Sequence, residues 1–196
     1  MDGAAMLTQR GIPPGKSFTY VYNLTQSGTY WIHGHDHHQN SDGLRTPFVI
    51  YDNNKPPYNY DGDILLTLED RFRQEFPEHA AAALDPFNAF PSPHGYGFGP
   101  INGINGNYSH PLQFISGKKY RIRLINMGRV NWFNFRLPGH HMQVIEADGV
   151  YTEPLEVDGT DMGLAQRYSV LVSAHNSSQF SYRFNTTLHA DFIPAA

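Results

Sequence analysis

Apolar and polar residues alternate along much of this chain in short runs that predict β-strands. In the stretch KYRIRLIN the alternation has a period of two, with Tyr120, Ile122 and Leu124 as the apolar set. Arg121 and Arg123 form the intervening polar set. In SFTYVYNL the same period places Phe18, Tyr20 and Tyr22 on one face.

Turns rich in glycine and proline separate further stretches of this kind. In chain order these are SGTYWIHGH, LRTPFVIYD, DILLTLED, WFNFRLPG, HMQVIEADG, AQRYSVLVS and FSYRFNT. The continuous apolar run in LRTPFVIYD predicts a strand that is buried on both faces. Residues 71–85, around an alanine run, form the single helix candidate, and NNKPPYNYDGD is the best linker candidate. The pattern predicts an all-β sandwich or barrel.

Composition narrows the function classes. The chain has 196 residues, 40% of them apolar, and a formal charge of −4 with 16% charged residues, which argues against a nucleic-acid partner. No run of 18 apolar residues exists, so the sequence contains no membrane span. The absence of cysteine excludes a disulfide framework, a thiolate nucleophile and a zinc-finger site.

Eleven histidines keep metal binding through imidazole open. His33 and His35 are two residues apart on a predicted strand, so both point the same way, about 6–7 Å apart. That spacing suits ligands of two metal ions, or of one ion if the strand twists slightly. A solvated histidine-rich loop is the alternative. His37 and His38 follow where the strand should end, so their direction is not predicted.

The stretch GTYWIHGHDHHQNSDGLRTPFVIYD resembles the second copper-binding motif of the multicopper oxidases, the laccase and ferroxidase family. The matching positions are Gly28, Thr29, Trp31, His33, His35, Gln39, Asp42, Gly43, Leu44, Phe48 and Asp52, with Thr46 near a position for a small residue. INGINGNY, YRIRLINMG, FRLPGHHMQVIEADGV and AQRYSVLV resemble later family elements in the same order. The opening MDGAAMLTQ is most similar to fungal iron-uptake ferroxidases and related laccase-like enzymes.

This resemblance implies a cupredoxin-like Greek-key β-sandwich or barrel, with one truncated and one complete domain. Residues 1–55 would be the C-terminal half of a first domain, and residues 60–196 a second domain. The implied activity is one-electron oxidation of a phenol or ferrous iron, coupled to four-electron reduction of dioxygen to water. In the family, the two histidines of this motif bind the type 3 copper pair of a trinuclear cluster, a role that the resemblance carries to His33 and His35 alone. No other side chain is assigned a catalytic or cofactor-binding role.

Several family features have no counterpart in this sequence. The first His-x-His-Gly motif and the C-terminal domain with its copper-binding cysteine are missing, so we expect a fragment that is inactive alone. Strands that lose their partners would also favour aggregation. The family's iron-binding acidic position falls at Pro138 or Gly139, where no carboxylate exists. Glu146 and Asp148 are expected to serve turns and structure.

The His140–His141 pair falls where the family has a structural Gly-His-x-Met pattern, so no metal role is expected for it. Four Asn-x-Ser/Thr sequons favour a secreted glycoprotein. They begin at Asn23, Asn107, Asn176 and Asn185. The chain opens without the pattern of a signal peptide, which a fragment would explain. The parent protein would be extracellular or on the cell surface, and its partner could be an iron permease.

Two other functions stay open. The chain could be a β module that binds copper or zinc without redox chemistry, through His33, His35, His37 and His38. It could also be a truncated product that has no function. Most such sites bind copper more tightly than zinc, whichever metal they use in the cell. A higher affinity for copper would therefore not identify the metal of this module.

Overall fold

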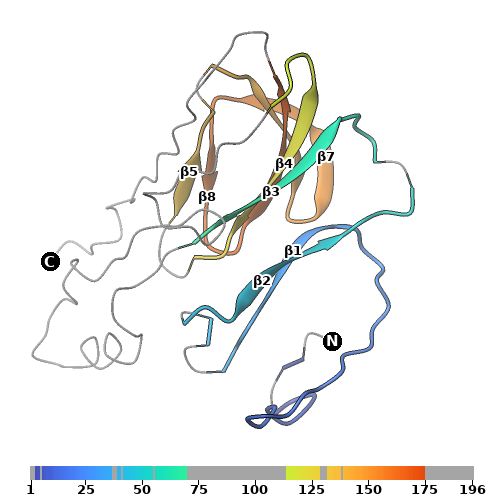
Figure 1. The fold of residues 1–196 in the computed structure, drawn as a ribbon, viewed down its shortest axis with the longest axis vertical. Coiled ribbons are helices and arrows are strands. Elements are labelled where there is room, and N and C mark those ends of the chain that lie inside the picture. Colours follow the sequence, from blue (N-terminus) through green and yellow to red (C-terminus); the bar gives the residue numbers. More distant parts are fainter. Residues whose placement is uncertain are drawn as a thin grey trace, which may run out of the picture.

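The structure is a computed structural model that describes residues 3–4, 6–36, 39–40, 42–54, 56–69, 114–128, 132–137 and 139–174. Within these ranges it has nine strands and no helix (Figure 1). The strands are β1 (Gly28–His33), β2 (Arg45–Ile50), β3 (Gly62–Leu68), β4 (Lys119–Asn126), β5 (Phe133–Phe135), β6 (Met142–Ala147), β7 (Val150–Val157), β8 (Thr160–Met162) and β9 (Arg167–Ser173). The helix expected in residues 71–85 and the strand FSYRFNT lie outside the described residues. No helix long and apolar enough for a membrane crossing occurs in the described ranges.

The centre of the fold is a five-stranded sheet in the order β3-β4-β9-β6-β7. β3 and β4 are parallel, and the other neighbours are antiparallel. One face of this sheet packs against the β5–β8 pair, and the apolar core lies between them. The core side chains are Leu66, Leu68, Ile122, Leu124, Phe133, Phe135, Leu137, Met142, Val144, Met162, Val170 and Val172.

β6 contains a β-bulge between Val144 and Glu146, which changes the direction in which its side chains point. Val144 pairs with Val170 on the core face, but Glu146, two residues later, pairs with Ser169. In a regular strand Glu146 would share the face of Val144. The extra residue therefore moves the carboxylate of Glu146 to the opposite face of the sheet.

That opposite face is polar although it is buried. Arg121 donates hydrogen bonds to Glu146 and to the hydroxyl of Ser169, at 3.1 Å in the latter case. Ser169 in turn donates to Glu146 at 2.9 Å. Burial by itself lowers the pKa of Arg121, but the Glu146 carboxylate and the phenols of Tyr60 and Tyr151 raise it above its ordinary value. Arg121 is therefore a cation inside the protein, and Glu146 lies beside it.

β1 and β2 form an antiparallel hairpin that covers part of this polar face (Figure 1). Gly28 pairs with Ile50 at one end, and His33 pairs with Arg45 at the other. The expectation of burial on both faces of β2 is wrong, because its residues are only partly buried or exposed. A two-stranded sheet leaves one of its faces without the second layer that full burial needs.

The strand predicted in SFTYVYNL is also wrong. Residues 17–24 have no strand partner among the described residues, and their apolar side chains are exposed. The rings of Phe18 and Tyr20 nevertheless contact each other, with centroids 4.9 Å apart. The strands expected around β1, β2, β3, β4, β5, β6 and β9 are confirmed, and β7 and β8 were not predicted.

The buried charge pair gives a stability prediction. Glu146→Gln should lower the free energy of unfolding by about 3–5 kcal/mol, because it leaves the Arg121 cation buried without its counter-ion. Glu156→Gln is the matched control, since Glu156 is exposed on the neighbouring strand β7. Urea unfolding followed by circular dichroism would measure both variants. Equal unfolding midpoints would contradict a central role for the ion pair.

Candidate metal centre

The rings of Trp31, His33 and His35 lie in a row along the end of β1 and the residues that follow it. The ring centroids of Trp31 and His33 are 4.3 Å apart and nearly parallel, at 28°. Those of His33 and His35 are 5.8 Å apart at 32°. This arrangement agrees with the two-residue period, which places alternate side chains on the same side of a strand.

The tautomer of His33 follows from one hydrogen bond. Its Nδ1 lies 3.0 Å from the carbonyl oxygen of Gly34. A carbonyl can only accept, so Nδ1 carries the proton and Nε2 keeps its lone pair for a metal ion. His33 is half-buried, and His35 is exposed.

The described residues contain no group of three or more His, Cys, Asp or Glu side chains placed to hold a metal ion. His33 and His35 place two imidazole rings next to each other, and imidazole is a ligand type that both copper and zinc accept. His37 and His38 lie outside the described residues. His140 and His141 lie just before β6, away from this pair in sequence, and the His140 ring is 6.1 Å from that of Phe114.

The loop between the two strands is closed by backbone hydrogen bonds. Gly34 N donates to Leu44 O at 2.8 Å, and Leu44 N donates to Gln39 O at 2.8 Å. A Cβ atom on Gly34 would lie 2.5 Å from Cβ of Gln39 and 2.9 Å from Cδ2 of Leu44. Glycine between the two histidines is thus a steric requirement of the loop that carries them.

Other motif positions have structural roles at the opposite end of the hairpin. Gly28 has a φ of +141°, and a Cβ there would lie 2.7 Å from Cα of Gly149 in the β6–β7 turn. Asp52 accepts hydrogen bonds from Ser27 Oγ at 3.4 Å and from Asn54 N at 2.8 Å. The motif therefore specifies the shape and seating of the hairpin as well as the histidines.

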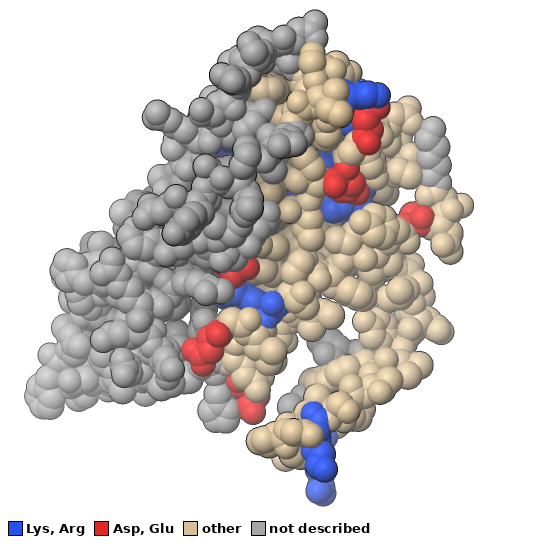
Figure 2. Space-filling model, in the orientation of Figure 1, with Lys and Arg blue, Asp and Glu red and all other residues tan. Residues whose placement is uncertain are grey.

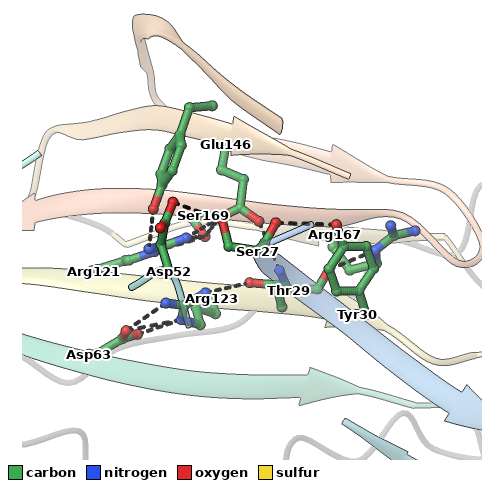
Figure 3. A network of polar contacts seen from close by, with 11 residues as sticks. Ser27, Thr29, Tyr30, Asp52, Asp63, Arg121, Arg123, Glu146, Arg167 and Ser169 are labelled. Atoms are coloured by element: carbon green, nitrogen blue, oxygen red, sulfur yellow. Dashed lines mark hydrogen bonds and ion pairs between the residues drawn. The ribbon is translucent and has the colours of Figure 1, made fainter. Parts of the chain in front are cut away.

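Thr29 joins the hairpin to the five-stranded sheet (Figure 3). Its backbone N donates to Glu146 Oε1 at 3.0 Å, and its hydroxyl accepts from Arg123 Nη1 at 2.8 Å. Its carbonyl oxygen accepts from Arg167 Nε at 3.0 Å. Arg123 is held in turn by a bidentate ion pair with Asp63 on β3, at 2.8 Å for each of the shortest contacts.

Arg45 makes the corresponding connection at the histidine end. Its guanidinium lies 3.3 Å from the carboxylate of Glu69, just after β3. It also donates to the carbonyl oxygens of Met127 at 3.1 Å and Asn40 at 3.2 Å. Sequence reasoning missed Thr29, Arg45 and the arginines of the sheet as supports of the site. One indication of these supports was present in the sequence: arginines occur within otherwise apolar strands. A buried arginine is energetically costly unless it has hydrogen-bonding or charged partners.

Charged side chains are scattered over the described surface. Figure 2 shows separate Lys, Arg, Asp and Glu groups among mostly neutral residues on the face in view. This distribution gives no support for a nucleic-acid interface, which requires clustered positive charge.

Comparison with known proteins identifies the family of this chain. Two family models described as "Multicopper oxidase" match residues 62–195 and residues 1–55. The laccase of Botrytis aclada superimposes with a TM-score of 0.72 at 32% sequence identity, over 86% of this chain and 33% of that one. The strands of the described residues thus belong to a fold of the cupredoxin-like class, and the family implies copper as the metal.

Two relatives make the assignment specific. The iron transport multicopper oxidase fio1 of Schizosaccharomyces pombe is 41% identical over 183 residues, covering 93% of this chain and 29% of its own length. Laccase-2 of Thanatephorus cucumeris is 38% identical over 206 residues, covering 95% of this chain and 33% of its own. This chain belongs to the multicopper oxidase family. It spans about a third of the length of these relatives.

The tight loop yields a second prediction. Gly34→Ala should lower the free energy of unfolding by about 1–3 kcal/mol, because the added methyl group must displace Gln39 or Leu44. Hydrogen exchange at the amide of Leu44 should speed up, since its bond to Gln39 would be disturbed. Gly11→Ala is the control, because nothing lies within 4 Å of a Cβ at that position. The same exchange rate in both variants would refute the steric argument.

Proposed function

We propose that this chain is part of an oxidase in which His33 and His35 bind the type 3 copper pair of a trinuclear cluster. The observation that carries the proposal is the paired imidazole arrangement within a chain of this family. The reaction would couple one-electron oxidation of a substrate to four-electron reduction of dioxygen to water. The remaining copper ligands would come from outside the residues described.

The donor set fits copper, because neutral imidazoles suit this metal. When bound, copper would accept electrons and deliver them to dioxygen. The protein's contribution at this point is the fixed tautomer of His33, whose Nδ1–H bond to Gly34 keeps Nε2 available. Trp31, stacked on His33, limits the orientations open to that ring.

The proposed substrates are dioxygen and a small reductant, either a phenol or ferrous iron. Named relatives include both an iron transport oxidase and a laccase, so similarity supports each. The turn at Gly139 offers no carboxylate for ferrous iron. Glu146 and Asp148 are engaged elsewhere, with Arg121 and with the backbone N of Arg167, respectively.

We also propose a division into residues 1–55, from a first cupredoxin-like domain, and residues 60–196, a second one. The separate ranges of the two family models support this division. The parent protein is proposed to act outside the cell or at its surface, where an iron permease would be its partner if iron is the substrate. The sequon at Asn23 is consistent with that location, because Asn23 is exposed.

Metal titration tests the ligand assignment. Isothermal titration of the chain with Cu²⁺ and Zn²⁺ should show a binding event that the His33→Ala/His35→Ala variant lacks. His141→Ala should bind as the wild type does, since His141 is exposed and outside the proposed site. Unchanged binding in the double variant would remove both histidines from the proposal. Tight zinc binding without any copper-dependent redox signal would favour a non-redox binding module.

Oxygen consumption tests the expectation for the chain alone. The copper-loaded 196-residue chain should not consume dioxygen above background with a phenol or with ferrous iron, because two histidines cannot hold three coppers and the sequence has no cysteine. An oxygen electrode gives the measurement, with a laccase as positive control. Sustained turnover would show that the chain is sufficient by itself.

A further inference from the structure

We infer that Thr29 and Arg45 are positioning residues for His33 and His35. They fix the β1–β2 hairpin on the five-stranded sheet from two ends, and so keep the two imidazoles side by side. The inference rests on the proposed copper role of the pair, and it assigns a function to contacts that lie away from any metal ligand.

Thr29 forms hydrogen bonds through its backbone N–H, its backbone carbonyl and its hydroxyl. Its N–H, hydroxyl and carbonyl bind three charged side chains, which come from β6, β4 and β9, respectively. The residue is completely buried. Hydrogen bonds with ionised partners are about twice as strong as neutral ones, so this residue is a rigid point of attachment.

Arg45 supplies the second point of attachment. It pairs with His33 in the register of the hairpin, and its side chain is 2% exposed. Its guanidinium connects three segments: the histidine loop through Asn40, the end of β3 through Glu69, and the end of β4 through Met127. The strand position opposite the first ligand is therefore tied directly to the sheet.

The hairpin needs such attachment because of its size. An isolated two-stranded hairpin is marginally stable in water. Thr29 and His33 are four residues apart on the same face of β1, a distance of about 13 Å. His33 forms a hydrogen bond with the carbonyl of Gly34, its neighbour in the chain. A bond between adjacent residues cannot orient the hairpin on the sheet. Thr29 and Arg45 supply hydrogen bonds from the hairpin to the sheet near its two ends, beside the close approach of Gly28 to Gly149.

For Arg45, charge repulsion and positioning predict opposite changes in the affinity for Cu²⁺. Removing the positive charge of Arg45 would strengthen Cu²⁺ binding if charge repulsion were the main influence. If Arg45 positions the hairpin, its removal weakens binding. Thr29→Val changes no charge and loses only the hydroxyl that Arg123 contacts. The two substitutions therefore separate geometry from charge.

The test compares four variants of the 196-residue chain by Cu²⁺ titration and electron paramagnetic resonance. Thr29→Val and Arg45→Gln should weaken the copper binding that depends on His33 and His35 about tenfold, the effect typical of outer supporting residues. They should also broaden the copper hyperfine lines, as ligand geometry becomes heterogeneous. Thr29→Ser, which keeps the hydroxyl, should behave as the wild type does. Lys118→Gln should do so too, since it removes an equal charge from an exposed pair with Asp61.

Circular dichroism establishes which variants are folded, and if Thr29→Val does not fold, Arg45→Gln decides alone. Wild-type affinity and spectrum in the folded variants would overturn the positioning role, as would tighter binding by Arg45→Gln. A role in stability only would lower the melting temperature and leave both metal readouts unchanged. If wild-type copper binding does not depend on His33 and His35, the proposed function itself fails, which is a distinct result.

Discussion

The buried pair of Arg121 and Glu146 is the interaction on which the rest of this structure depends. Two charges inside a protein are costly unless their remaining hydrogen-bonding groups find partners. Ser169 and Tyr151 supply some of these from within the sheet. The other oxygen of Glu146 accepts the backbone N–H of Thr29, which belongs to the hairpin. The buried polar groups of the sheet therefore have all these hydrogen-bond partners only when the hairpin lies on the sheet. The same hydrogen bonds hold the hairpin in place.

This mutual dependence explains how a motif can extend far beyond two metal ligands. Gly28 permits close approach to the β6–β7 turn, and Gly34 permits a tight loop between the histidines. Thr29 receives the charged side chains of the sheet. Most of the motif thus specifies where the hairpin lies. The position of the hairpin in turn determines the positions of the two histidines. A metal site built on strands can be set in advance by such supports, before any ion arrives.

The sequence predicted the local features well and the long-range ones poorly. The alternation in β4 and the same-side placement of His33 and His35 need only a strand, so both could be foreseen. β7 was missed because its residues VYTEPLEV combine two glutamates with Pro154, which strands tolerate chiefly at a sheet edge. The SFTYVYNL prediction failed because alternation cannot supply a neighbouring strand. The contacts of Thr29 with Glu146 and Arg167 span 117 and 138 residues, a separation no local pattern can reveal.

The bulge in β6 means that the number of residues in this strand decides which face each side chain occupies. If the same residues formed a regular strand, the carboxylate of Glu146 would share the face of Val144, toward the apolar layer, and Arg121 would lose its counter-ion. If the one residue between Val144 and Glu146 were deleted, Glu146 would directly follow Val144 and would stay on the polar face. A relative without the bulge can therefore keep both faces of β6 by being one residue shorter at this point. When sequences of this family are aligned, a gap placed at the bulge keeps the inward and outward faces of β6 correctly assigned.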